Sequence, residues 1–510
     1  MAQEAGVKQE KRAVVELLMN NKIIVTPDLL AKLETVEQAA QWLALKNSGA
    51  AAQTGSAATN QENDAVKIVF NYAAEPKSRS VHDFVSLFNN RFSMIARILG
   101  NRQELKGLTS IGRISAKADR EKISIVGMVY DKQETRNENI ILVLEDQTGT
   151  IKVIVSKAKQ QLYEIARDAA LDQVIGITGT TANGVIFANS IVLPEIPMQN
   201  ELRKSSEPAA VVLLSDIEVG NKKFMAREFD KFLQWLNGEA GSEEHKQLAK
   251  KVKYIIVAGD VVAGVGVYPG QEEDLAISDI KEQYRECARL LAKVPERIKI
   301  IIAPGNHDAV RISEPQPILN NSWAKPLTEL KNATLVSNPA IVNIHSSAEF
   351  SGFNVLIYHG YGFDDYGETV YSIKNQGRHL SDRADLIMKF MLRARHLAPT
   401  YGSTLYIPEA KDNLVIDLVP DIFVSGHIHK AAVASYRGVL MVCGSCWQPK
   451  TDFQEKLGHD PDPCVVPIID LETRKITMLN FKDGESESKK TNDKEETNQC
   501  VGNQDSKKEN

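Results

Sequence analysis

The stretch Ile298-Lys299-Ile300-Ile301-Ile302-Ala303-Pro304-Gly305-Asn306-His307-Asp308 decides the fold of this chain. Its first part, up to Ala303, is apolar almost without interruption, which is the pattern of a parallel strand covered on both faces. The pentapeptide Pro304–Asp308 follows in the loop, where α/β proteins carry their chemistry, and Gly305 lets the backbone turn sharply there. The stretch therefore predicts an α/β domain with reactive side chains at the end of a buried strand.

Four further junctions repeat this arrangement of an apolar strand and a loop with a carboxylate or a histidine. Two divalent cations about 3.5–4 Å apart require such a set, because one carboxylate bridges the ions and each ion needs several O or N ligands. The mixture of histidine, asparagine and carboxylate suits Mn²⁺, Fe²⁺ or Zn²⁺ better than Ca²⁺. We therefore expect the loops to form one two-metal site. In chain order the further junctions place Asp216 and Glu218 after residues 211–215, Asp260 after 254–258, His359 after 353–358, and His427 and His429 after 422–425.

The order of these motifs resembles that of the calcineurin-like metallophosphoesterases, and the resemblance covers residues 209–482. It implies an α/β fold, a calcineurin-like phosphoesterase β-sandwich flanked by helices, which hydrolyses phosphoesters with two divalent ions. The resemblance also implies a role for each residue. Asp216 and His429 match ligands of the first metal, Asp260 the bridging carboxylate, Asn306, His359 and His427 ligands of the second metal, His307 the catalytic histidine at the leaving oxygen, and Asp308 the residue that orients it.

One position departs from the family pattern. The first motif usually reads Asp-x-His, whereas this chain reads Asp216-Ile217-Glu218. Glutamate can bind Mn²⁺ through oxygen, so we count Glu218 among the metal ligands. We expect its extra negative charge to change the metal preference of the site. The same charge can also slow catalysis.

The chain ahead of this domain has a different character. Residues 107–195 read as five short strands with a helix between the third and the fourth, which is the order of an OB-fold β-barrel. Such a fold often binds single strands, but this one lacks a dense aromatic and basic strand face, which favours a scaffold or partner surface. The remaining expected parts are a small helical N-terminal domain at 1–46, a flexible linker at 47–66, a helical lead-in segment at 67–106, a linker at 196–208 and a disordered tail at 483–510.

A single helix is expected within the lead-in segment. Ser80-Val81-His82-Asp83 has the capping-box form that opens a helix. Apolar residues follow at helical spacing, and we interpret them as a core-packing face. They are Phe84, Phe88, Phe92, Ile95 and Leu99.

Composition limits the classes of protein that fit. The 510 residues carry a formal net charge of −5, whereas a free-standing nucleic-acid binder is usually basic, so DNA contacts must be local, metal-assisted or shared with a partner. No stretch reaches about 18 apolar residues, and the start lacks a signal-peptide pattern, so we expect no membrane contact. Five cysteines indicate a reducing interior. Cys443 and Cys446 form a CxxC without a second CxxC for zinc, which favours core packing.

Two features narrow the resemblance further. They are the stretch Gly444–Gln454 with the following Pro461–Pro467, and the OB-fold ahead of the phosphoesterase. Together they resemble the small-subunit family of archaeal family D DNA polymerases. The resemblance implies a 3′→5′ exonuclease that removes mispaired primer ends in DNA replication, with Mn²⁺ as the first candidate metal and Mg²⁺, Fe²⁺ and Zn²⁺ as alternatives. It also implies the large catalytic subunit as partner, primer 3′ ends and single-stranded DNA as ligands, a sliding clamp reached through the complex, and the archaeal cytosol near the nucleoid as location.

Two other functions stay open at this point. A non-catalytic scaffold subunit of the same polymerase would keep a relic metal site, and an independent hydrolase would lack the polymerase partner. The near-complete ligand set favours the nuclease over the scaffold, and the OB-fold and Trp447–Gln454 disfavour an independent hydrolase. Replacing Asp260 or His307 by alanine is expected to abolish nuclease activity and to leave assembly intact.

Overall fold

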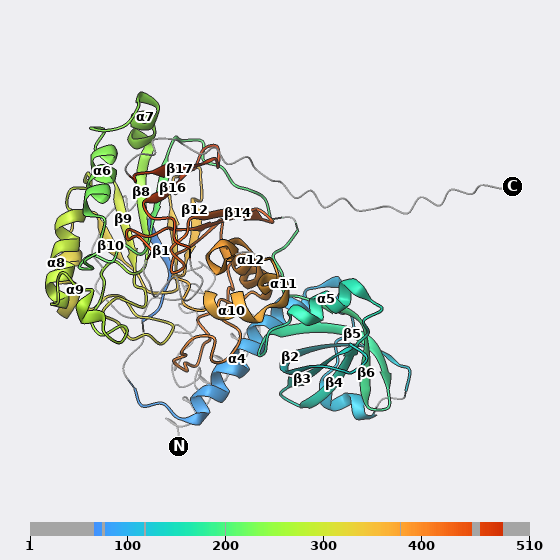
Figure 1. Ribbon diagram of the computed structural model, residues 1–510. Helices are drawn as coiled ribbons and strands as arrows, with labels where there is room; N and C mark the ends of the chain where they lie inside the picture. Colours follow the sequence, from blue (N-terminus) through green and yellow to red (C-terminus); the bar gives the residue numbers. More distant parts are fainter. Residues whose placement is uncertain are drawn as a thin grey trace, which may run out of the picture. The chain divides into compact units, whose positions relative to one another are not determined.

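The computed structural model describes residues 66–73, 77–116, 119–198, 200–377, 379–450 and 460–482 (Figure 1). The expected N-terminal domain, nearly all of the linker after it, the expected tail and the end of the stretch 444–454 lie outside these residues. The described chain is of mixed α/β type, with two six-stranded sheets and a closed five-stranded barrel. None of its helices is both long and apolar enough to cross a membrane.

The run that begins at Ile298 forms a strand, β9, inside the first six-stranded sheet, whose order is β10-β9-β8-β7-β16-β17. Strands β7, β8 and β9 run parallel, as the sequence predicts. The second sheet has the order β1-β11-β12-β13-β15-β14, and β12 runs parallel to β13. The bounds are β7 Ala210–Leu214, β8 Val252–Ala258, β9 Lys299–Ala303, β10 Ala333–Leu335, β16 Val465–Asp470, β17 Ile476–Asn480, β1 Val66–Asn71, β11 Ala340–Ile344, β12 Phe353–Ile357, β13 Ile422–Ser425, β14 Ala432–Tyr436 and β15 Val439–Cys443.

Strand β7 shows why these strands are apolar without alternation. Val211 and Leu213 belong to the core between the two sheets, whereas Ala210, Val212 and Leu214 belong to the core under the helices. Helices α6, α8 and α9 cover the first sheet, and α10, α11 and α12 cover the second, which gives a β-sandwich flanked by helices (Figure 1). The helices are α6 Ala226–Leu236, α7 Glu243–Lys251, α8 Ile280–Leu291, α9 Asn321–Thr328, α10 Phe363–Thr369, α11 Tyr371–Lys374 and α12 Ala384–Ala394, with short 3₁₀ turns at Gln103–Leu105, Ile111–Ala116, Gln271–Glu273 and Leu380–Arg383.

The barrel has the strand order β2-β3-β4-β6-β5 and closes through pairing of β2 with β5. Helix α5 lies between β4 and β5, the third and fourth barrel strands in chain order, where the sequence predicts it. Closure removes the open edges that a five-stranded sheet would otherwise present. The elements are β2 Lys122–Glu134, β3 Ile140–Asp146, β4 Gly149–Val155, α5 Gln160–Asp168, β5 Val174–Ala182 and β6 Val185–Val192.

The structure corrects the prediction that residues 67–106 form a purely helical segment. Val66–Asn71 is strand β1, which pairs antiparallel with β11 at the edge of the second sheet. The physical reason is that β-branched and aromatic residues fit a pleated edge once a partner strand is present. That partner lies at residues 340–344, so local periodicity could not indicate it.

Helix α4 (Val81–Gly100) begins where the capping pattern predicts. The backbone N–H of Ser80 donates to Asp83 Oδ2 at 2.7 Å. Ile95 and Leu99 are fully buried, whereas the three phenylalanines predicted beside them are half-buried. The predicted apolar face is therefore only partly the buried face of α4. The buried face also contains a charged residue, Arg91, which the prediction did not include.

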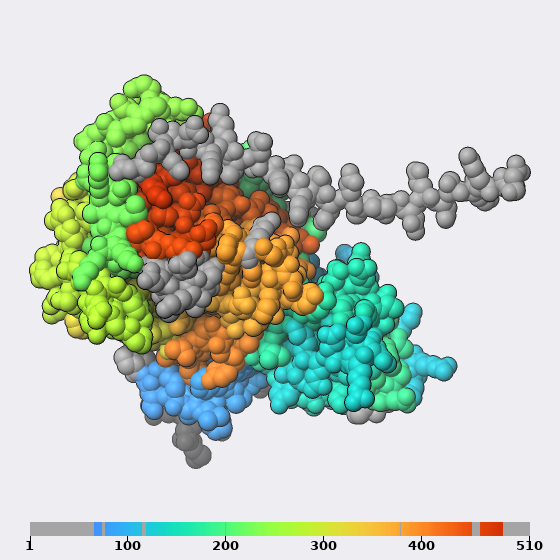
Figure 2. Space-filling model, viewed as in Figure 1, coloured from blue at the N-terminus to red at the C-terminus, as the bar shows by residue number. Residues whose placement is uncertain are grey.

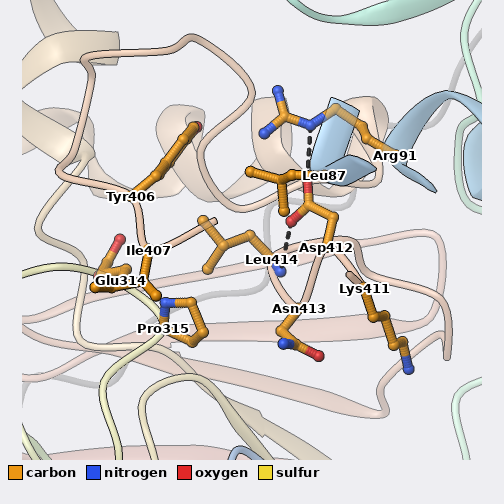
Figure 3. Close-up of a pocket in the computed structure, with 10 residues that line it drawn as sticks. All are labelled: Leu87, Arg91, Glu314, Pro315, Tyr406, Ile407, Lys411, Asp412, Asn413 and Leu414. Atoms are coloured by element: carbon orange, nitrogen blue, oxygen red, sulfur yellow. Dashed lines mark hydrogen bonds and ion pairs between the residues drawn. The ribbon is translucent and has the colours of Figure 1, made fainter. Parts of the chain in front are cut away.

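Arg91 is 1% exposed on that buried face, and Figure 3 shows it at a small pocket beside the chain of residues 406–414. Its Nε donates to Asp412 Oδ2 at 2.7 Å, and a terminal guanidinium nitrogen donates to the Pro399 carbonyl. His396 Nε2 lies 3.0 Å from the same Asp412 oxygen. Burial alone would raise the pKa of Asp412, but the charge of Arg91 holds it well below its usual range. The pair ties α4 to the large domain.

Replacing Arg91 by methionine is expected to lower the free energy of unfolding by about 3–5 kcal/mol, because it leaves the Asp412 carboxylate buried without the guanidinium charge. Arg97→Met on the same helix is the matched control. Its pair with Asp417 has side chains 67% and 48% exposed, so we expect a loss of about 0–1 kcal/mol. Urea unfolding measures both variants, and equal losses would contradict the role of the buried pair.

Candidate metal centre

Loops that follow parallel strands of both sheets come together at one place. Three of them follow β7, β8 and β9, and two follow β12 and β13. Contacts between the sheets join them, since the backbone N–H of His427 donates to Asp216 Oδ2 at 3.0 Å. His359 Nε2 lies 3.2 Å from Asp260 Oδ2. The structure thus brings together side chains from loops that lie far apart in the sequence.

One group of side chains surrounds Asp216. His429 Nε2 lies 3.4 Å from Asp216 Oδ1 and 3.4 Å from Glu218 Oε1. All three residues are buried, with Asp216 fully enclosed. Glu218 therefore points its carboxylate into the same group as Asp216 and His429, at the position where the family pattern has a histidine.

A second group surrounds Asn306. Its Oδ1 lies 2.9 Å from His359 Nε2 and 3.1 Å from His427 Nδ1. Asp260 joins this group to the first, because donor atoms of Asp216, Asp260 and His359 all lie within 4.8 Å of one another. Asp260 thus occupies the place of a carboxylate shared by both groups.

His307 lies at the margin of the two groups, with its side chain 16% exposed. Its Nδ1 lies 3.0 Å from the Ala263 carbonyl, which accepts a hydrogen bond from Nδ1–H and leaves Nε2 for a substrate. Its backbone N–H donates to Asp260 Oδ1 at 2.7 Å. Burial alone would lower the pKa of His307, but the charges of Asp260 and Glu218 outweigh burial and raise it. His307 is therefore suited to hold a proton.

Asp308, which the resemblance matches to the residue that orients His307, binds the backbone of the loop that carries this histidine. Its Oδ2 accepts from the Gly305 N–H at 2.9 Å and from the Val261 N–H at 3.4 Å. Its Oδ1 accepts from the Tyr284 hydroxyl at 3.3 Å. Asp308 therefore fixes the loop 304–308 to its neighbours, while the Ala263 carbonyl contacts the ring of His307 directly. The neighbouring peptide groups and the tyrosine satisfy this buried carboxylate.

Gly305 is required for space, because its backbone approaches Asp260 closely. Its φ is not in the left-handed region, and a Cβ at this position would lie 2.2 Å from Asp260 Oδ1. Left-handed backbone occurs at predicted ligands instead, and such strain in non-glycine residues is typical of functional sites. The residues and their φ values are Asp216 (49°), Glu218 (50°), Asp260 (52°), His427 (72°) and His429 (57°).

The buried carboxylates draw positive charge toward the site. Burial alone would raise the pKa of Asp260, but His359 and His307 hold it well below its usual range. Burial alone would lower the pKa of His359, but Asp260 raises it to about 10. Burial raises the pKa of Glu218. The carboxylates thus favour positive charge at this place, and a divalent cation would supply it by binding the deprotonated ligands.

The donor set fits two divalent cations. Carboxylate oxygen, amide oxygen and imidazole nitrogen are the ligands that Mn²⁺, Fe²⁺ and Zn²⁺ accept. Asp260, fully enclosed between the two groups, can contribute to both ions. The first ion would take Asp216, Glu218 and His429, and the second would take Asn306, His359 and His427.

Two side chains to which the sequence assigned no role lie against predicted ligands. Asp364 Oδ2, at the start of α10, lies 3.3 Å from His427 Nε2. Gln448 Nε2 donates to Glu218 Oε1 at 2.6 Å. Partners of this kind orient metal-binding side chains. Gln448 belongs to the stretch 444–454 that carries part of the family resemblance, and this membership is the signal that could have indicated it. Nothing in the sequence marks Asp364.

Comparison with known proteins identifies relatives of this chain. The family model for the B subunits of DNA polymerases alpha and epsilon matches residues 211–434. The chain is 40% identical over 405 residues to the DNA polymerase II small subunit of Pyrococcus abyssi, covering 79% of this chain and 63% of that protein. It is 38% identical over 400 residues to that of Methanothermobacter thermautotrophicus, covering 78% and 80%. The chain thus spans less than two thirds of the length of the first relative and about four fifths of the second.

Solved structures resemble parts of the chain only slightly. Vps29 of Entamoeba histolytica, crystallised with Zn²⁺, is 11% identical and covers 55% of this chain and 97% of its own, with a TM-score of 0.26. An archaeal phosphodiesterase is 14% identical and covers 53% and 98%, with a TM-score of 0.25. Likeness at this level carries no argument about function.

Proposed function

Because the chain belongs to the family of archaeal DNA polymerase II small subunits, we propose that it is the exonuclease subunit of a family D DNA polymerase. In this proposal it hydrolyses DNA phosphodiesters from the 3′ end and removes mispaired primer ends during replication. The large catalytic subunit is its partner, and polymerisation belongs to that subunit. The large domain then has a calcineurin-like fold, and the barrel is an OB-fold.

One observation carries this proposal. The donor atoms of Asp216, Asp260 and His359 lie within 4.8 Å of one another in a buried position, and further predicted ligands adjoin them. A site that selection no longer maintained would be expected to lose several of these positions. Only Glu218 departs from the family pattern, and it too points into the donor group.

The chain's own residues can perform the remaining steps of hydrolysis. Two divalent cations bound here, with Mn²⁺ as the first candidate, would polarise the phosphodiester and activate water for in-line attack. His307 holds a proton at Nε2 and gives it to the leaving oxygen, while its Nδ1 stays on the Ala263 carbonyl. Asp260 holds the backbone of His307, so the proton donor keeps a fixed distance from the donor groups.

The proposed ligands are the primer 3′ end and single-stranded DNA, and a sliding clamp is reached only through the complex. The net charge of −5 supports this division, because phosphate binding by an isolated protein normally relies on a surplus of lysine and arginine. The barrel is proposed as a scaffold or partner surface.

The alternative is a non-catalytic scaffold with a relic metal site. A primer–template with a mismatched, labelled 3′ end distinguishes the two functions when it is offered to the isolated chain and to the complex in Mn²⁺, Mg²⁺ or Zn²⁺. We expect shortening from the 3′ end that requires metal and stops with EDTA. Intact primer in every metal, with and without the large subunit, would leave the scaffold as the function.

Replacing Glu218 by histidine in the same assay is expected to keep the activity and to shift the metal preference from Mn²⁺ toward Zn²⁺. The reason is that imidazole nitrogen suits Zn²⁺ better than a further carboxylate oxygen does. Rates measured over a series of both metals check this outcome. An unchanged order of metals would show that Glu218 is no ligand.

A further inference from the structure

Gln448 is buried against Glu218, and the resemblance assigns it no role at the metal site. The two residues are 4% and 2% exposed, and Gln448 Nε2 donates to Glu218 Oε1 at 2.6 Å. The other end of the amide, Oε1, is buried and has no hydrogen-bond partner among the described residues. A buried carbonyl without a donor is unfavourable, so the contact at the other end of the amide must offset it. The amide therefore keeps this orientation because it donates to Glu218.

The backbone that carries Gln448 is fixed to the loop of the first metal group. The Trp447 N–H donates to the Asp216 carbonyl at 3.1 Å, and the Ser215 hydroxyl donates to the Ser445 carbonyl at 2.9 Å. The Trp447 ring packs edge-on against Phe229 with centroids 4.8 Å apart. Figure 2 shows the red surface of this later part of the chain next to the green surface of the part that includes α6. Gln448 is thus held in register with residues 216–218.

The contact also keeps the Glu218 carboxylate with the first donor group and away from His307. Glu218 Oε1, which receives the Gln448 amide, lies 3.4 Å from His429 Nε2. Glu218 Oε2 lies 3.9 Å from His307 Nδ1. Without the amide, the carboxylate could turn toward His307 and leave the metal group. A fixed amide on Oε1 opposes this rotation.

We propose that Gln448 is a positioning residue that holds Glu218 as a ligand of the first metal. This inference rests on the proposed function and specifies one ligand of its site. A glutamine amide can donate through nitrogen or accept through oxygen, so it suits a carboxylate at 218 in one orientation and a histidine in the other. A glutamate at 448 can only accept when ionised, so it suits histidine at 218 but repels Glu218.

This difference defines the test. Mn²⁺ binding to the full chain is measured by titration calorimetry for the wild type, Gln448→Glu, Glu218→His and the double variant. We expect Gln448→Glu to weaken Mn²⁺ binding roughly 10–100-fold beside Glu218. In the Glu218→His background the same change should leave binding unchanged or tighten it, because the carboxylate accepts the imidazole N–H. An equal change in both backgrounds, or none beside Glu218, would overturn the proposal.

Two further variants make the result specific. Gln234→Glu is the matched control, because Gln234 also donates to a carboxylate, Asp230 Oδ2 at 2.8 Å, but on an exposed surface, and its Mn²⁺ binding should equal that of the wild type. Gln448→Met removes the amide without adding charge, and we expect weaker binding there too. If Gln448→Glu does not fold, wild-type affinity in Gln448→Met overturns the proposal.

The readout also separates this inference from the proposed function. Calorimetry needs no DNA and no nuclease activity. The expected dependence on residue 218 in a chain that does not shorten DNA would overturn the nuclease alone. An active nuclease without that dependence would overturn only the role of Gln448.

Discussion

The Asp260→Asn variant is expected to lose nuclease activity and tight binding of both metals. Asp260 is the fully buried carboxylate that joins the two donor groups, so the change removes its negative charge from both. Asparagine keeps the shape and tolerates the φ of 52° at this position, so the backbone should stay in place. Metal ions contribute several kcal/mol to such reactions. We therefore expect the rate of hydrolysis by Asp260→Asn to fall by at least on the order of 10³-fold.

Titration calorimetry with Mn²⁺ and shortening of a mismatched primer by the complex with the large subunit measure the two losses. Asp417→Asn is the matched control, because this carboxylate is 48% exposed on a surface pair with Arg97, and it should behave as the wild type. Wild-type binding and rate in Asp260→Asn would contradict a bridging role.

The His307→Ala variant is expected to lower the rate of hydrolysis roughly 10²–10⁴-fold, which is the usual contribution of a positioned acid or base. Mn²⁺ binding and assembly with the large subunit should stay unchanged, because His307 stands beside the donor groups and not among the predicted ligands. This combination distinguishes a proton donor from a metal ligand.

A substrate with an activated leaving group, such as an aryl phosphodiester, sharpens the test. Its leaving oxygen needs no proton, so the defect of His307→Ala should shrink toward the wild-type rate. His82→Ala, an exposed residue of α4, is the control and should not change either rate. A defect of equal size on both substrates would contradict proton transfer by His307.

Much of the large domain could be predicted because burial on both faces leaves a simple signature. Strand β9 is apolar from Ile300 to Ala303, and the polar side chains of the site come where the strand ends. The loops follow from the same rule, since carboxyl ends of neighbouring parallel strands meet at one edge. The hairpin turns of the barrel and the position of its helix could be predicted as well, because turn residues and changes of hydrophobic period are local signals.

What could not be predicted depends on partners distant in the sequence. Strand β1 needs β11 to form, and Arg91 could be recognised as a core residue only with Asp412 in place. A backbone carbonyl such as that of Ala263 has no sequence signature, so its contact with His307 Nδ1 could not be predicted. The left-handed backbone conformation of the predicted ligands likewise depends on tertiary contacts.

A working phosphodiesterase centre and a relic of one differ most directly in one rate. It is the release of the 3′-terminal nucleotide from a mispaired primer by the complex with the large subunit in Mn²⁺. We expect the wild type to release it on the order of 10³-fold faster, or more, than a complex that carries Asp260→Asn and His307→Ala together. Equal release by two fully assembled complexes would contradict a nuclease at this centre.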